Sequence, residues 1–155
     1  MRLARMIVAV MVFTSMAFIP SCGEKKTASL EGNEDISAVL QQLPECLDNI
    51  AIAKAIYTEN AILHYQNIET AQVKALTGSK EIGNYLKEIG MQRCWTKVSI
   101  QDIKKEADTA HVVYQITSQG RKSTIENTLY CSAEMVKQGQ IWKIKEARTK
   151  FDIYR

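Results

Sequence analysis

The chain has 155 residues, of which 46% are apolar and 24% are charged, so it has the length and composition of one globular domain with one core. The formal net charge is +3 at pH 7, and no stretch interleaves clustered Lys and Arg with aromatic residues. Because contact with a nucleic-acid backbone needs such a basic surface, these features argue against nucleic acid as a partner.

The N-terminus has the pattern of an export signal. Arg2 and Arg5 precede fourteen residues, Met6 to Ile19, in which only Thr14 and Ser15 are polar. This apolar run is too short to span about 30 Å of hydrocarbon comfortably. It therefore predicts a cleaved signal and not a permanent transmembrane helix.

The end of this run resembles the cleavage site of a bacterial lipoprotein signal peptide. In that family a small residue precedes an invariant cysteine, whose thiol receives diacylglycerol before the signal is removed. Ser21 and Cys22 match these positions, and Ile19 supplies the aliphatic residue three positions before the cysteine. The alternative is ordinary signal-peptidase cleavage after Ala17, since Ser15 and Ala17 form a small-x-small pair.

The resemblance implies a signal peptide over residues 1–21, a lipid on Cys22, and a polar tether over residues 22–34. Removal of the signal lowers the net charge to about +1. Several acyl chains, each contributing about 0.8 kcal/mol per buried CH₂, would hold the protein stably on a membrane. Gly23 is not the aspartate that retains some lipoproteins in the inner membrane of enteric bacteria. The resemblance therefore favours the periplasmic face of the outer membrane in a Gram-negative host.

Three helices are expected in the first part of the domain. Apolar residues at helical spacing predict one helix over 35–43, ended by Pro44. Residues 46–57 predict a second helix, which is apolar almost all round near Ile50 to Tyr57, as expected of a helix buried on several sides. The third helix, over 79–90, has Ser79 as its expected N-cap and a glycine at its end.

The remainder of the domain is strand-like. Two short strands are predicted at 61–66 and 73–78, and four long alternating runs follow at 95–107, 109–118, 123–137 and 141–153. Helices first and a long antiparallel meander last predict an α+β fold.

This order of elements is similar to the nuclear transport factor 2-like superfamily, which includes ketosteroid isomerases and SnoaL-like polyketide cyclases. Three segments carry the resemblance: "IAKAIYTENAILHY", "ALTGSKEIGNYL" and "GQIWKIKEARTKFD". The resemblance assigns residues 35–155 to one such domain. It implies a strongly curved antiparallel sheet wrapped around about three N-terminal helices, forming a cone with a pocket at its open end. It also implies a homodimer through the convex face of the sheet.

The catalytic positions of the ketosteroid isomerases are not filled here. The resemblance places their general base at Tyr65, and a tyrosine with an ordinary pKa of about 10 is a poor base. Their helix-one tyrosine falls near Gln41, and their protonated acid falls on or beside Leu129, which can donate nothing. Isomerase chemistry of that kind is therefore not expected, and no catalytic residue is assigned.

Other side chains are candidates for a ligand pocket. Period-two alternation places Tyr65 and His64 on opposite faces of their strand, so if Tyr65 points into the cone, His64 points away from it. Glu146 and Arg148 alternate with Trp142 on one face of the last strand, and the resemblance turns that face inward. The two charged residues are then expected near the pocket mouth, either as a simple ion pair or as a clamp on a ligand.

Two further residues complete the predicted pocket. Asn127 shares its face with Leu129 and Cys131, where an amide either orients a ligand or bonds a neighbouring backbone group. Tyr114 either adds aromatic lining or fills the core. His64 and His111 lie in separate strands without metal-ligand spacing, so no metal or other cofactor is expected.

Three cysteines remain once Cys22 is lipidated. Cys46 and Cys94 fall in loop-like positions of an exported protein and are candidates for one disulfide, whose geometry the sequence does not fix. Cys131 is expected to be a buried, small apolar residue.

Three functions remain open at this level. The first is a lipid-anchored cell-envelope domain that binds a small, partly apolar molecule in its cone without catalysis. The second is a protein-interaction or dimerisation module with a filled cone. The third is an enzyme that uses a nonstandard set of Tyr65, Asn127, Glu146 and Arg148.

We expect native mass spectrometry of the protein purified from its source membrane to find a chain that begins at Cys22 and carries the mass of its acyl groups. A chain that begins at Phe18 without acyl mass would show instead that ordinary signal peptidase cleaves after Ala17. The same spectrum would report the oligomeric state and any retained ligand.

Overall fold

The computed structural model describes residues 34–66 and 72–151. The predicted signal peptide, Cys22 and the predicted tether up to residue 33 lie outside the described residues. Within the described part of the chain, no helix is both long enough and apolar enough to cross a membrane.

The described residues form helices followed by long strands, as predicted. The helical elements are α1 (Glu34–Gln41), the 3₁₀ helix η1 (Leu43–Leu47), α2 (Ile50–Ile56) and α3 (Ser79–Gln92). The strands are β1 (Tyr57–Gln66), β2 (Val73–Thr77), β3 (Arg93–Glu106), β4 (Thr109–Gly120), β5 (Glu126–Gln138) and β6 (Ile141–Phe151).

The second predicted helix is divided in two. Pro44 lies in the first turn of η1, and α2 begins after Asn49, whose side chain accepts a hydrogen bond from the Ala51 backbone N–H at 3.0 Å. The predicted cap of α3 is also displaced by one position. Its N-cap is Gly78, with a φ of 94° that favours glycine, and Ser79 is its first helical residue.

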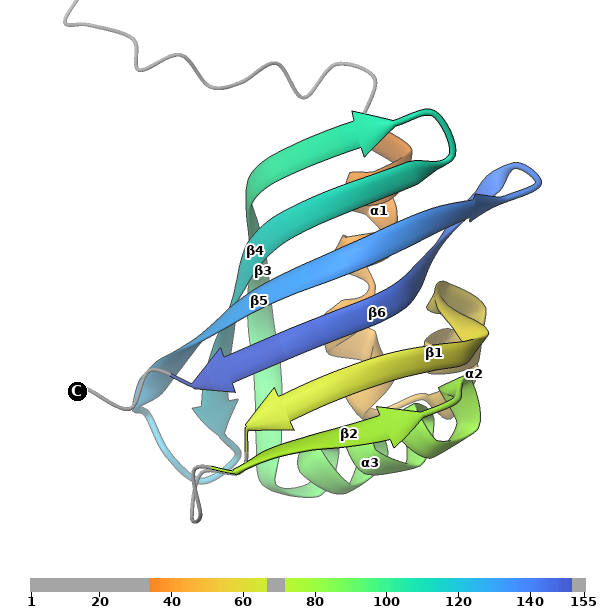
Figure 1. Cartoon of the computed structure of the whole chain (residues 1–155). Coiled ribbons are helices and arrows are strands. Elements are labelled where there is room, and N and C mark those ends of the chain that lie inside the picture. The colour runs from red at the N-terminus through yellow and green to blue at the C-terminus, as the bar shows by residue number, and fades with distance from the viewer. Residues whose placement is uncertain (1–33, 67–71, 152–155) are drawn as a thin grey trace, which may run out of the picture.

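The strands build a single six-stranded sheet in the order β2-β1-β6-β5-β4-β3 across the described residues. Figure 1 shows this sheet curving around the helices, which all lie on its concave side. The predicted α+β cone fold is therefore correct. The sheet was expected to be all antiparallel, but β1 and β6 pair in parallel. These two strands are far apart in the chain, so no hairpin determines their relative direction.

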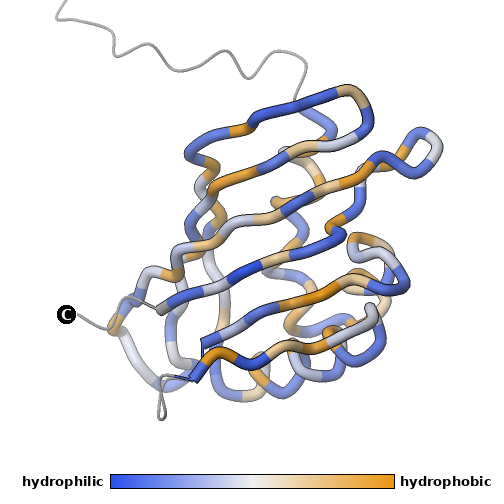
Figure 2. Tube along the Cα trace, in the orientation of Figure 1, coloured by the Kyte–Doolittle hydropathy of each residue, from blue (hydrophilic) through white to orange (hydrophobic). Residues whose placement is uncertain are grey.

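Alternation along the strands places one set of side chains in the core, as the changing colours along each strand of Figure 2 illustrate. The buried residues of β4 are Ala110, Val112, Tyr114, Ile116 and Ser118. Register shifts in the β3–β4 pairing, at Trp95/Lys97 and at Ile100/Asp102, accompany the bend of these strands in Figure 1.

A bulge in β6 reverses the faces of two predicted site residues. Glu134 pairs with Glu146 while the next residue of β5 pairs with Ile144, so Lys145 is the extra residue on β6. After the bulge, Ala147 is the buried residue, and Glu146 and Arg148 point to the convex side. The prediction that these two side chains share the inward face of Trp142 is therefore wrong.

Gly90 allows α3 to pack directly against η1. A Cβ atom at this position would lie 2.8 Å from the carbonyl carbon of Leu47 and closer still to its oxygen. Arg121, in the β4–β5 turn, strengthens this junction: its Nε donates to the Gly90 carbonyl, and its Nη2 donates to Asp48 Oδ1 at 2.6 Å. The Arg121 backbone N–H also donates to the Gln92 carbonyl at 3.0 Å. The end of α3 and the β4–β5 turn are thus held side by side.

We expect Gly90→Ala to lower the free energy of unfolding by about 3 kcal/mol or to prevent folding, because a main-chain carbonyl must move to admit the methyl group. Gly83→Ala in the same helix is the matched control. Its new Cβ meets a side-chain methyl of Ile50 at 3.1 Å, and the alanine gains about 1 kcal/mol of helix propensity. Urea unfolding measures both variants. Equal midpoints would contradict a special role for Gly90.

Candidate functional site

A narrow inner cleft lies between the concave face of the sheet and the helices. Its walls are mostly aliphatic and aromatic, and they include Tyr57, Tyr85, Tyr114, Leu129 and Thr149. The free space is about 20 Å³, which is enough for about one water molecule. The interior of the cone is therefore almost filled by its own side chains.

The tyrosines of the inner cleft remain protonated at neutral pH. Burial is the main cause that raises the pKa of Tyr57, Tyr85 and Tyr114 above the ordinary value for tyrosine. Their phenols can therefore donate hydrogen bonds but do not act as bases.

A larger outer hollow, of about 440 Å³, opens where β3 and β5 begin and β4 ends. It is lined by Gln92, Arg93, Gly120, Ser123, Ile125 and Asn127. Arg93 carries the one charged side chain among these six residues. The junction at Gly90 positions this hollow, because it holds Gln92 beside the β4–β5 turn.

The outer hollow and the inner cleft are neighbours on the concave face. Arg93 and Trp95 are alternate residues of β3, and Asn127 and Leu129 are alternate residues of β5. In each pair the first residue lines the outer hollow and the second lines the inner cleft. The concave surface thus passes from an apolar interior to a polar rim.

Ser118 joins the two sides of this rim. It is fully buried on β4, paired with Trp95 of β3 on one side and with Asn127 of β5 on the other. Arg93 Nη1 donates to Ser118 Oγ at 3.5 Å. Three polar side chains, from Arg93, Ser118 and Asn127, therefore lie on three neighbouring strands at the mouth of the cone.

The predicted pocket residues fall in different places. Tyr114 is buried in the wall of the inner cleft, whereas Asn127 is exposed in the outer hollow. Tyr65 is half-buried, and its ring centroid lies 4.3 Å from that of Tyr85, which lines the cleft. Arg93 was not predicted as a site residue. Its alternation with Trp95 would have revealed it if the predicted strand had begun two residues earlier.

Glu146 and Arg148 do form an ion pair, but on the convex face. Arg148 Nη2 lies 2.7 Å from Glu146 Oε1, and His64 Nε2 lies 3.2 Å from the same oxygen. The enzyme hypothesis required these residues to act with Tyr65 and Asn127. Because the sheet separates the two pairs, the four side chains do not form one site.

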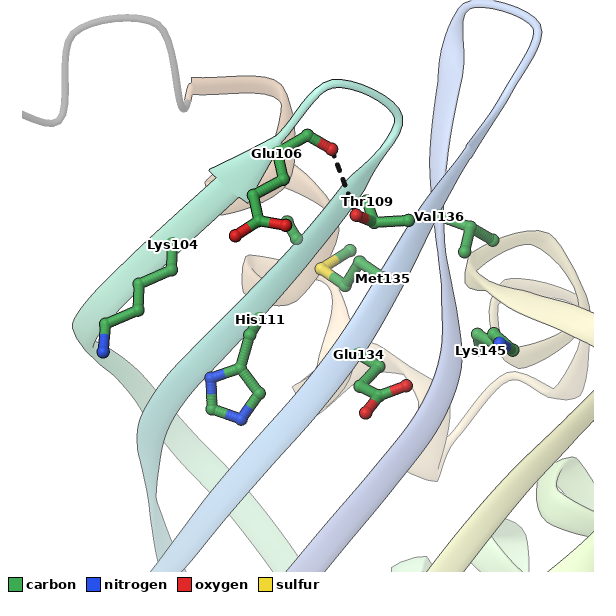
Figure 3. A pocket seen from close by; sticks show the side chains of 9 residues that line it. Lys104, Glu106, Thr109, His111, Glu134, Met135, Val136 and Lys145 are labelled. Atoms are coloured by element: carbon green, nitrogen blue, oxygen red, sulfur yellow. Dashed lines mark hydrogen bonds between the residues drawn. The ribbon is translucent and has the colours of Figure 1, made fainter.

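Both histidines lie on this convex face. His111 pairs across the strands with Glu134, which pairs with Glu146, which contacts His64, so these four residues form a convex row. His111 and Glu134, both labelled in Figure 3, also line a hollow of about 340 Å³. No group of three or more His, Cys, Asp and Glu side chains is arranged to hold a metal ion in the described part of the chain.

No protein-family model matches the sequence, and no curated protein matches it either. Solved structures do match it. A ketosteroid isomerase-like protein from Erwinia carotovora atroseptica has 15% sequence identity and a TM-score of 0.61, over 77% of this chain and 92% of that one. A nuclear transport factor 2-like protein of unknown function from Silicibacter pomeroyi has 7% identity and a TM-score of 0.60, over 78% and 96%.

A third similar structure is a domain of unknown function with a cystatin-like fold from Nostoc punctiforme. It has 13% identity and a TM-score of 0.65, over 79% of this chain and 78% of that one. At these identities the likeness establishes the fold. The chain has the nuclear transport factor 2-like cone fold, a curved and unclosed sheet around three helices.

The described cysteines are all free thiols. Cys46 is buried and donates to the Gln42 carbonyl at 3.7 Å, and half-buried Cys94 donates to the Gln119 carbonyl at 3.5 Å. The candidate disulfide between them is not formed in the structure. Cys131 is buried, as expected. Burial is the main cause that raises the pKa of both Cys46 and Cys131 to about 12.

We expect a thiol reagent at pH 8 to label Cys94 first in the native protein, with Cys22 lipidated or replaced by serine. Cys46 and Cys131 should react only after unfolding, because the thiolate is the reactive form and burial keeps both of them protonated and enclosed. Mass spectrometry of labelled peptides identifies each site. If Cys46 and Cys94 reacted only after a reductant was added, they would be joined in a disulfide.

Proposed function

We propose that this protein is a non-catalytic cell-envelope domain, held on a membrane by a lipid on Cys22, that binds a small, partly apolar molecule at the mouth of its cone. The observation that carries the proposal is the outer hollow of about 440 Å³, which adjoins the tyrosine-lined inner cleft. Its size falls within the range of about 300–1,000 Å³ that is usual for small-molecule sites.

The nearly filled interior limits how such a molecule would sit. The inner cleft has room for about one water molecule, so most of the ligand would lie in the outer hollow, against Ile125. Tyr65 and Tyr85 are half-buried at the edge of the cleft, and their rings contact each other at a tilt of 34°. A ligand would reach further inward by displacing this aromatic pair.

The side chains at the mouth support binding more than catalysis. Tyr65 occupies the position at which the resemblance to the isomerases expects a general base, and Leu129 occupies the position of an acid. In the structure Leu129 is buried in the cleft wall, so that position offers no proton donor. Orientation of a ligand by Arg93 and Asn127 requires no such group.

The filled cone also favours the second candidate, a protein-interaction module. An interaction module with a filled cone predicts an interior with little free space, and the inner cleft has room for about one water molecule. The homodimer through the convex face stays a prediction. That face exposes Val113 and Tyr130 among charged side chains, including Glu134 and Arg148, so an interface there would be largely polar.

We expect the mature chain from Gly23, which retains every described element, to bind the apolar dye N-phenyl-1-naphthylamine. Asn127→Trp should weaken binding about tenfold or more, because the larger side chain fills part of the outer hollow and a loss of about 1.4 kcal/mol is a factor of ten. Thr128→Trp is the matched control, since the neighbouring residue points to the opposite face.

Dye fluorescence measures both affinities, with excitation outside the tryptophan band. Equal weakening by the two variants would place the dye elsewhere. A wild-type chain that binds no dye would contradict the ligand-binding function and leave the interaction module.

A further inference from the structure

The convex hollow of about 340 Å³ gathers ionisable side chains of both signs. It lies where β3 ends and β4 begins, and four strands contribute to its charged lining: Lys104, Glu106, His111, Glu134 and Lys145. Two lysines and two glutamates balance each other in formal charge when His111 is neutral. The volume falls within the range of about 300–1,000 Å³ that is usual for small-molecule sites. The sheet separates this hollow from the mouth of the cone.

The charges of the convex hollow are not joined to one another. No ion pair in the described part of the chain connects two of its lining residues. Glu134 pairs across the strands with Glu146, whose Oε1 already lies 2.7 Å from Arg148 Nη2. Glu134 therefore has a like charge as its neighbour. Because like charges on adjacent strands are unfavourable, a ligand cation at Glu134 would relieve this repulsion.

The strand register sets opposite charges apart at a regular spacing. Lys104 pairs with His111, and His111 pairs with Glu134, so the three residues lie side by side across β3, β4 and β5. Figure 3 shows the imidazole of His111 between the other two side chains. Neighbouring strands lie about 4.8 Å apart, so the backbones of Lys104 and Glu134 are separated by about 10 Å. A ligand lying across His111 can therefore meet a cation at one end and an anion at the other.

We propose that the convex hollow binds a small zwitterion, with its carboxylate against Lys104 and His111 and its ammonium group against Glu134. A lone anion there would also meet the repulsion of Glu106 and Glu134, and a lone cation that of Lys104 and Lys145. A zwitterion places each of its charges beside the opposite sign, and charge-assisted hydrogen bonds are stronger than neutral ones. A short ω-amino acid carries its charges at the two ends of its chain, as the spacing of these side chains requires.

The test follows the histidine rings by NMR at pH 7 in the mature chain from Gly23. The probes are 4-aminobutyrate, butyrate and butylamine, which have equal numbers of carbons and carry both charges, only the negative charge or only the positive charge. The chain has two histidines, so His111→Gln assigns both sets of signals. We expect 4-aminobutyrate to shift the His111 signals with a Kd about tenfold lower than either singly charged probe. His64, which does not line the hollow, should respond less.

Two substitutions at exposed positions separate the two contacts. In Lys104→Gln, 4-aminobutyrate should bind no better than butylamine, and in Glu134→Gln it should bind no better than butyrate. Lys97→Gln and Glu126→Gln are the matched controls, since they make the same charge changes at exposed positions near the other ends of the same strands. Both controls should keep the preference for the zwitterion.

A further measurement does not depend on a variant. Added salt should reduce the advantage of 4-aminobutyrate over the singly charged probes in the wild-type chain, because salt screens both ion pairs. Equal affinities for the three probes, or an advantage that survives Lys104→Gln or Glu134→Gln, would overturn the proposal. So would His111 signals that no probe moves. None of these outcomes affects the dye-binding test, because the dye is expected at the mouth of the cone on the opposite face of the sheet.

Discussion

The close approach of α3 to η1 at Gly90 sets the geometry on which the mouth of the cone depends. The absence of a side chain at this position lets the helix pack on the Leu47 carbonyl, and Arg121 then connects the helix end to the β4–β5 turn and to Asp48. The next residues, Gln92 and Arg93, end the helix and begin β3. The position of the polar rim therefore depends on the contact between Gly90 and the Leu47 carbonyl, although neither residue lies in the rim.

The nearly filled interior and the open mouth follow from the same curved sheet. Strand alternation places large side chains such as Trp142, Tyr114 and Leu129 in the cone, and together they leave space for about one water molecule. The residues one alternation further toward the strand ends are polar, and there Arg93 is half-buried and Asn127 is exposed. Binding at the rim and a well-packed core are thus compatible in one domain.

The convex face carries a second group of polar side chains that a single residue insertion created. Without the bulge at Lys145, Glu146 and Arg148 would point inward with Trp142. With it, Glu146 lies beside Glu134, forms an ion pair with Arg148, and has His64 Nε2 at 3.2 Å. Like charges on neighbouring strands are unfavourable without such partners. The bulge thus removes two charges from the interior and gives them compensating neighbours.

The sequence by itself determined the parts of this protein that depend on local periodicity: the helices, the long strands and the α+β class. Helical and strand periods repeat every few residues, so one chain suffices to recognise them. Only the tertiary structure decided the parallel pairing of β1 with β6, the convex positions of Glu146 and Arg148, and the place of Arg93 and Asn127 in one hollow at the mouth. Each of these depends on the pairing register between strands that are distant in the chain. One extra residue in a strand exchanges the two faces of that strand, and the local sequence pattern does not reveal it.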